Sequence, residues 1–269
     1  MGLSRHGFRV LAADTNEASL QWALEQGIIA GYAQAQDSDA MPTLLSQADY
    51  LVLALYPQDI NSWLRQHKQY FKPGALITDL AGVKSCFVEE AQALLGEAHE
   101  FIPSHPMAGR EVSGVRNAND AIFAGANFLI TPTSRNTPAG ISFAKELAKI
   151  LGFARHTILS IQEHDAMIGY VSQLTHAIAV SLMNANADPR LPEVTGDSFR
   201  DLTRIANMNA SLWSELFLAN REALTLEIDQ FSAALHELRK RLAAGDKAGL
   251  EELFCQSTQR RQDFDKKSN

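Results

Sequence analysis

Residues 105–114 read HPMAGREVSG and place a histidine, two glycines and a pair of opposite charges in one short segment. The preceding stretch, 100–103, resembles a buried strand and ends in a proline, which cannot donate a ladder hydrogen bond. The backbone is therefore expected to leave its sheet near Ser104 and to present His105 from a loop at the carboxyl end of a strand. Open α/β sheets bind ligands at that edge, and histidine exchanges protons near neutral pH. A histidine that only caps a turn is the alternative.

Apolar runs and helical periodicities alternate around this segment. Strands are predicted at 8–14, 50–55, 75–79, 126–132 and 154–159, and helices at 17–26 and 138–151. The run at 50–55 is continuously apolar, which is typical of a parallel strand covered on both faces. From Ile161 onward the pattern is helical, with long segments at 161–187, 213–242 and 248–264. The sequence thus predicts an α/β half, residues 1–158, and a helical half, residues 159–269.

Composition narrows the class of protein. The 269 residues are 46% hydrophobic and 20% charged, as in ordinary globular chains. A formal charge of −7 and a pI near 5.6 argue against a nucleic-acid partner, which needs a basic face. Apolar runs are expected to fall short of a membrane span. Cys86 and Cys255 are far apart and, with no secretory leader in view, favour the cytoplasm.

Several segments in order resemble the prephenate dehydrogenases, oxidoreductases of tyrosine biosynthesis. They are HPMAGREVSG at 105–114, DLAGVK at 79–84, HD at 164–165, SQLTH at 172–176, FRDLTRI at 199–205, LW at 212–213 and Asn220. The resemblance implies a Rossmann-like doubly wound sheet followed by an all-α dimerisation domain, and a homodimer. It also implies NAD-dependent oxidative decarboxylation of prephenate to 4-hydroxyphenylpyruvate. Arogenate, with an amino group in place of the side-chain ketone, is the alternative substrate.

The resemblance assigns roles to individual residues. His105 would be the catalytic base, and Arg204 would anchor a substrate carboxylate through two parallel hydrogen bonds, with Asp201 orienting it and His176 approaching the substrate. The remaining predicted contacts are Ser104 and Gly109 for the substrate, and Asp14, Tyr56, Pro57, Asp79 and Gly82 for the cofactor. An acid at the position of Asp14 binds the adenosine ribose and favours NAD over NADP.

Each assignment has a purely structural alternative. Asp14 could cap the helix after it, Pro57 could simply turn the chain, and Asp201 and Arg204 could form a surface ion pair. His176 could be a satisfied core histidine. No metal is expected, because a zinc site would have to be built from His99, His105, His164 and His176, which include no i, i+4 pair.

Two features depart from the family pattern. The glycine-rich turn that holds a dinucleotide pyrophosphate has no counterpart, since Gly2 and Gly7 have the wrong spacing and follow no strand. A start upstream of Met1 is the favoured explanation, and a truncated, catalytically impaired dimeric binding module is the other. The family also often carries a serine where this chain has Gly82, and Lys84 nearby could be a surface lysine with a buried stem.

Overall fold

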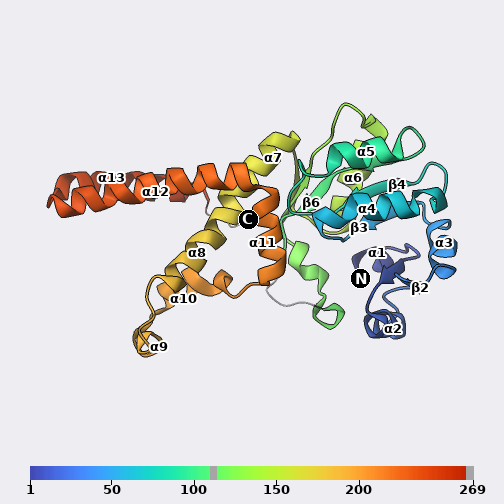
Figure 1. Ribbon diagram of the computed structural model, residues 1–269, viewed down its shortest axis with the longest axis horizontal. Helices are drawn as coiled ribbons and strands as arrows, with labels where there is room; N and C mark the ends of the chain where they lie inside the picture. Colours follow the sequence, from blue (N-terminus) through green and yellow to red (C-terminus); the bar gives the residue numbers. More distant parts are fainter. Residues whose placement is uncertain (110–113, 265–269) are drawn as a thin grey trace. The chain divides into compact units, whose positions relative to one another are not determined.

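The structure is a computed structural model that describes residues 1–109 and 114–264 (Figure 1). The chain divides into two compact units, Met1–Arg221 and Glu222–Asn269. The described strands all lie in the first unit. The second unit is formed by α12 (Arg221–Ala243), apart from its first residue, and α13 (Lys247–Gln262). Arg241 near the end of α12 donates to the carbonyl of Gly249 at 2.7 Å, and Asp246 caps α13, so the two helices form an antiparallel hairpin.

The strands of the first unit form three small sheets. β1 (Leu11–Asp14) pairs in parallel with β2 (Gly31–Gln34), and β3 (Tyr50–Leu53), β4 (Leu76–Asp79) and β5 (Glu100–Ile102) form a second parallel sheet. In the third sheet β6 (Ser104–Pro106) is antiparallel to β7 (Asn127–Ile130), which is parallel to β8 (Arg155–Ile158). No hydrogen-bonded pairing joins β1 to β3 among the described strands. This separation is the expected arrangement of a doubly wound sheet that lacks the strand between them.

Helices connect the strands, including the two predicted at 17–26 and 138–151. α2 (Glu17–Glu25) begins at Asn16, whose side chain accepts from the amide of Ser19, and it ends before Gly27, whose φ of +66° suits glycine. α4 (Pro57–His67) and α6 (Pro138–Ile150) both begin with a proline at a position that has no hydrogen bond to lose. The other helices of this part are α1 (Gly2–Arg5), α3 (Ala40–Leu45) and α5 (Val88–Leu95).

The structure corrects two expectations about the strands. β3 is covered on one face only: Leu51 and Leu53 are buried in the core, whereas Tyr50 and Val52 remain 47% and 40% exposed. Tyr50 stacks on Phe143 of α6 at a centroid distance of 4.5 Å, which covers part of its ring. His105 lies in strand β6 rather than in a loop. The chain leaves one sheet at Pro103, as predicted, but enters the next sheet one residue later.

A long helical stretch follows β8. α7 (Ile161–Ile168) starts with a capping box between Ser160 and Glu163 and continues through the π-helical η4 (Gly169–Leu174) into α8 (Thr175–Asn184). By length and composition alone, 161–184 could cross a membrane, which the sequence reading did not anticipate. Such a helix is weak evidence of a span, because core helices pass the same test. The shorter elements after it are α9 (Leu191–Val194), α10 (Asp197–Thr203), η5 (Arg204–Ala206) and α11 (Ala210–Ala219).

This helix is less enclosed than its sequence suggests. Apolar residues around most of its circumference predict burial between partners. In the structure, however, four of its large apolar side chains are each roughly half exposed: Met167, Tyr170, Val171 and Met183. The face that carries His164, Asp165 and Gln173 is buried, and it is this face that contributes to the polar site described next.

Candidate active site

A buried lysine ties together the chain segments around His105. The side chain of Lys84 is fully buried and forms an ion pair with Asp79, at the end of β4, which is also fully buried. Its ammonium group also donates to the carbonyl of Ala81 at 3.0 Å and to that of Ser104 at 2.6 Å. Because an ammonium has three protons, these three acceptors satisfy it. Lys84 therefore fixes the end of β4, the loop after it and the start of β6 relative to one another.

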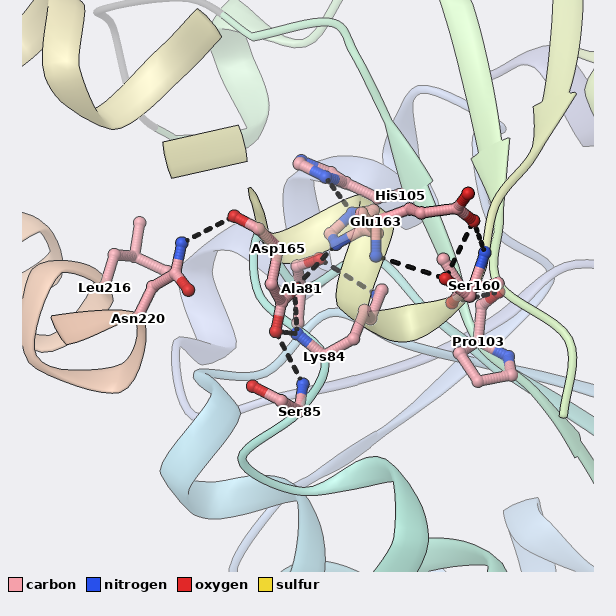
Figure 2. Close-up of polar contacts among 12 residues, drawn as sticks. Ala81, Lys84, Ser85, Pro103, His105, Ser160, Glu163, Asp165, Leu216 and Asn220 are labelled. Carbon is pink, nitrogen blue, oxygen red and sulfur yellow. Dashed lines mark hydrogen bonds and ion pairs between the residues drawn. The ribbon is translucent and has the colours of Figure 1, made fainter. Parts of the chain in front are cut away.

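Two histidines and an aspartate form a continuous hydrogen-bonded chain (Figure 2). His105 Nδ1 lies 3.0 Å from His164 Nε2, and His164 Nδ1 lies 2.7 Å from Asp165 Oδ1. The side chain of His164 is completely buried and Asp165 is 5% exposed, while His105 is partly buried. The chain therefore runs from the interior of the protein outward to His105.

The carboxylate of Asp165 is held by the backbone of the loop that contains Lys84. Its Oδ1 accepts from the amide of Lys84 at 3.0 Å, and its Oδ2 accepts from the amide of Ser85 at 2.8 Å. On the other side, the Asn220 amide donates to the backbone carbonyl of Asp165 at 2.9 Å and to the Gln173 side chain at 2.7 Å. Gln173 in turn donates to the carbonyl of Leu216. Asn220, the C-cap of α11, thus braces the backbone of Asp165 and is itself held by Gln173 of η4.

The surroundings shift the pKa values of these groups in a consistent way. Desolvation, followed by the positive charge of Lys84, lowers the pKa of His105 well below the ordinary histidine value. Burial opposes ionisation of Asp165, yet hydrogen bonds from His164 and Ser85 keep the pKa of its carboxyl below the ordinary value. Burial also lowers the pKa of Lys84, against the attraction of Asp79. At neutral pH His105 is therefore an uncharged imidazole that can accept a proton.

Three predicted site residues lie around this network with different roles. Ser104 and Asp79 are fully buried: the Ser104 amide donates to Asp79 Oδ1 at 3.1 Å, and Asp79 Oδ2 accepts from Lys84 and from the amide of Ala81. Both residues are engaged inside the protein and build the floor beneath His105. Gly82 is partly buried, and a Cβ at this position would lie 4.0 Å from Cε1 of His105 and 3.5 Å from Leu216.

The residues predicted to bind the substrate carboxylate lie in the helical part. Arg204 opens η5 and is exposed, and Asp201 lies one turn before it in α10. His176 is partly buried in α8, where its Nδ1 donates to the carbonyl of Ser172 at 2.8 Å and its ring stacks on Trp213. Gly109 is exposed, and residues 110–113 lie outside the described residues. The convergence of Arg204 and His105 on one ligand remains a prediction.

The predicted cofactor residues lie at the carboxyl ends of parallel strands. Asp14 ends β1 and is exposed, and its carboxylate accepts from the amide of Asn16 at 2.8 Å. Tyr56, 39% exposed, precedes Pro57 at the start of α4, just after β3. Dinucleotides bind along this edge of an α/β sheet, and an exposed carboxylate there matches the hydroxyl groups of a ribose. That these residues contact a nicotinamide dinucleotide remains a prediction.

The residues that connect the site were not predicted to do so. Lys84, interpreted as a surface lysine with a buried stem, is instead fully buried. His164, Asp165 and Asn220 belong to the quoted segments, but no catalytic or binding role was predicted for them. An adjacent His-Asp pair in an otherwise apolar helix was the available signal, since buried polar groups require partners. In the described part of the chain, no three His, Cys, Asp or Glu residues gather as metal ligands.

Comparison with known proteins matches two successive parts of the chain to one family. Residues 2–155 match the model of the prephenate dehydrogenase nucleotide-binding domain, and residues 160–256 match that of the prephenate dehydrogenase dimerization domain. The chain is 31% identical over 262 residues to the prephenate dehydrogenase of Lactococcus lactis, covering 95% of this chain and 70% of that protein. It is 26% identical over 257 residues to the enzyme of Bacillus subtilis, covering 92% and 66% of the two proteins.

A solved structure is similar over nearly the whole chain. The prephenate dehydrogenase of Aquifex aeolicus, crystallised with hydroxyphenyl propionate and NAD+, superposes with a TM-score of 0.89 at 26% identity. The match covers 98% of this chain and 92% of that one. The Rossmann-like sheet followed by a helical region is therefore the fold of this chain.

Proposed function

Because the chain belongs to the prephenate dehydrogenase family, we propose that it catalyses NAD-dependent oxidative decarboxylation of prephenate to 4-hydroxyphenylpyruvate. The observation that carries this proposal is the uncharged, partly buried His105 at the outer end of a buried polar chain. A neutral imidazole in this position is suited to accept the proton of the substrate's ring hydroxyl.

In the proposed mechanism, His105 accepts the proton of the hydroxyl group on the substrate's ring. At the same time, the ring carbon that bears this hydroxyl group loses a hydride. NAD+, when bound, supplies the hydride acceptor. The ring carboxylate then departs as CO₂, and its bonding electrons make the ring aromatic. His105 returns its proton to the new phenolic oxygen, so the reaction releases no net proton. Aromatisation provides the driving force, and the protein supplies the base and the orientation of the substrate.

Arg204 is proposed to bind a carboxylate of the substrate. Prephenate is a dianion, and the planar guanidinium matches a carboxylate with two parallel hydrogen bonds. Asp201, one turn earlier, would orient Arg204, and Gly109 and His176 would contribute to the rest of the pocket. Asp14, Tyr56, Pro57 and Gly82 are the residues proposed to hold the cofactor.

Replacement of His105 tests the catalytic assignment. His105→Asn is expected to lower kcat by about 10²–10⁴-fold, the usual contribution of a general base, with the formation of reduced nicotinamide as the readout. His67→Asn is a matched control, because it also removes a buried histidine but lies outside the network. Near-normal turnover in His105→Asn would remove this residue from the mechanism.

Replacement of Arg204 tests the substrate assignment. Arg204→Gln is expected to raise KM for prephenate, whereas Arg200→Gln, which replaces an exposed arginine on the preceding helix α10 that pairs with Asp197, should not. Parallel assays with prephenate and arogenate identify the preferred substrate. Calorimetric titration with NAD+ tests cofactor binding directly, and a chain that binds neither NAD+ nor substrate would contradict the proposal.

We also propose that the chain forms a homodimer in the cytoplasm through its helical domain, from residue 159 onward. The match to a dimerization domain and the exposed apolar residues of 161–184 support this assembly. Two exposed cysteines without a disulfide, Cys86 and Cys255, are compatible with a reducing compartment. A monomeric mass by light scattering would contradict the dimer.

A further inference from the structure

We propose that Asp165 and His164 set the tautomer of His105, so that its Nε2 carries no hydrogen and is available as the proton acceptor. This inference rests on the proposed function for its catalytic meaning, although the tautomer itself can be measured without substrate. His164 and Asp165 are positioning residues in this scheme, because they act only through His105.

The argument begins at the carboxylate. Asp165 accepts hydrogen bonds from the backbone amides of Lys84 and Ser85, and amide groups can only donate. Hydrogen bonds also hold its pKa below the ordinary aspartate value, so the side chain is ionised at neutral pH. An ionised carboxylate carries no hydrogen and can only accept hydrogen bonds. The hydrogen between Asp165 and His164 must therefore reside on His164 Nδ1.

The next step concerns His164, whose completely buried ring contacts Asp165 through Nδ1 and His105 through Nε2. A neutral imidazole that carries its hydrogen on Nδ1 has an acceptor at Nε2. The 3.0 Å contact between His164 Nε2 and His105 Nδ1 must then be donated by His105. A neutral His105 with its hydrogen on Nδ1 presents Nε2 as an unprotonated acceptor.

The same chain supports the charge that forms during the reaction. When His105 Nε2 takes a proton, the ring becomes an imidazolium whose Nδ1 already donates to His164. The carboxylate of Asp165 lies one ring further along and is fixed by two backbone amides. A preorganised negative charge of this kind stabilises the transient cation without rearrangement of the site.

Asp165→Asn should reverse the chain of donors. An asparagine oxygen in the place of Oδ2 can accept from both backbone amides, since Ser85 donates to Oδ2 at 2.8 Å and Lys84 lies 3.3 Å from it. The NH₂ group then takes the place of Oδ1 and faces His164 Nδ1, at the loss of the 3.0 Å contact between Oδ1 and the Lys84 amide. Nδ1 must then accept, Nε2 of His164 must donate, and His105 Nδ1 must accept. The hydrogen of His105 is thereby moved to Nε2, where it blocks the base.

Nitrogen NMR of the histidine rings, recorded on the ¹⁵N-labelled full chain without ligand, tests this assignment. The His105 and His164 signals are assigned from their absence in His105→Asn and His164→Phe. In the unmodified protein, we expect His105 to show a protonated Nδ1 and a bare Nε2, and in Asp165→Asn the reverse. Asp188→Asn, at a partly exposed aspartate that pairs with Arg190, serves as the matched control and should change neither ring. A hydrogen on Nε2 of His105 in the unmodified protein would overturn the proposal, as would an unchanged tautomer in Asp165→Asn.

Kinetics provide an independent measurement. Asp165→Asn should lower kcat by about 10²–10⁴-fold, because the base is blocked, with little change in KM. His164→Phe keeps an aromatic ring but removes the acceptor, and should lower kcat on the order of 10–100-fold, as when a partner that orients a functional histidine is lost. If Asp165→Asn does not fold, the His105 tautomer in His164→Phe tests the proposal instead. A mixture of the two His105 tautomers supports the proposal, and an unchanged tautomer with its hydrogen on Nδ1 contradicts it.

The two proposals fail in different ways. If the spectra show the predicted reversal but the chain turns over neither prephenate nor arogenate, the tautomer assignment stands and the proposed function fails. If the chain turns over prephenate but Asp165→Asn leaves the tautomer and kcat unchanged, the function stands and this inference fails.

Discussion

Lys84 and Asp79 form an ion pair in which neither side chain reaches solvent. The pair is embedded in further hydrogen bonds, since Asp79 also accepts from the amides of Ala81 and Ser104, and Lys84 also donates to the carbonyls of both residues. Removal of one partner from such a pair leaves an uncompensated buried charge.

Lys84→Met is therefore expected to lower the free energy of unfolding by about 3–5 kcal/mol, measured by urea denaturation. Combining Lys84→Met with Asp79→Asn should restore part of the lost free energy of unfolding, because the uncharged asparagine leaves no unpaired buried charge. Lys72→Met is the matched control. Lys72 pairs with Asp49 at the surface, and its removal should cost about 0–1 kcal/mol. A loss in Lys84→Met no larger than in Lys72→Met would contradict the structural role.

The depressed pKa of His105 predicts a pH dependence of activity. Below its own pKa the imidazole is protonated and can no longer act as a base, and that pKa lies well below the ordinary value of about 6.5. The acid limb of kcat/KM should therefore lie well below pH 6.5. A limb at or above pH 6.5 would show that the site does not suppress protonation of His105.

The same pKa predicts a pH dependence of stability. As the pH falls below about 6.5, His105 takes up a proton in the unfolded chain but not in the native state. Stability should thus decrease with falling pH, by at most about 1.4 kcal/mol per pH unit for this group, and level off below the native pKa. His67 and His99, whose pKa values are also lowered by burial, contribute in the same direction. The difference between the unmodified protein and His105→Asn isolates the contribution of His105, and parallel curves would contradict it.

Gly140 lies where α6 packs closely against β5. A Cβ at this position would collide with the carboxylate of Glu100 and would lie 2.6 Å from Cδ1 of Ile102, which is completely buried. Glu100 has little room to move, because it accepts from the amide of Thr137 at 2.6 Å and from its hydroxyl at 2.9 Å. Gly140→Ala should lower the free energy of unfolding by about 1–3 kcal/mol in a denaturant titration. An unchanged midpoint would mean that the helix can shift without cost.

Gly82→Ala is expected to stabilise the protein, in contrast to Gly140→Ala. Its nearest neighbours would be at 3.5 Å or more, and its φ lies outside the left-handed region that favours glycine. The substitution restricts the unfolded chain and should raise the free energy of unfolding by about 0.4–1 kcal/mol. Gly82→Ser should be accommodated equally well and would place a hydroxyl group near His105. A marked destabilisation by either substitution would show that the loop needs glycine.

Much of the fold could be predicted from the sequence, because its signals are local. Asn16 and Gly27 bound α2, and Pro138 opens α6, as capping chemistry requires. The continuous apolar run at 50–55 wrongly predicted that β3 is buried on both faces, since Tyr50 and Val52 are partly exposed. Burial of a strand face depends on which elements pack against it, and the run itself does not contain this information. The position of His105 in a strand also depended on a distant partner, Leu129 of β7.

The candidate site was predicted less completely, for a related reason. The importance of His105 follows from its own chemistry and setting, whereas Lys84 and Asp165 act through partners from distant parts of the sequence. Asp165 meets the amides of residues about 80 positions away, and Asn220 reaches back 55 positions to it. Such pairings depend on the fold, so they could be found only in the structure.

The separation of β1 and β2 from the neighbouring sheet has a consequence for dynamics. β1 packs with α2 around a small apolar cluster, Leu20, Ala23 and Ile29, whereas Ala33 of β2 belongs to the large core. A cluster of this size resists local opening far less than the large core beneath β3 and β4. Amide protons of β1 should therefore exchange with solvent sooner than those of β4, and a ligand that engages Asp14 would slow that exchange by closing the segment.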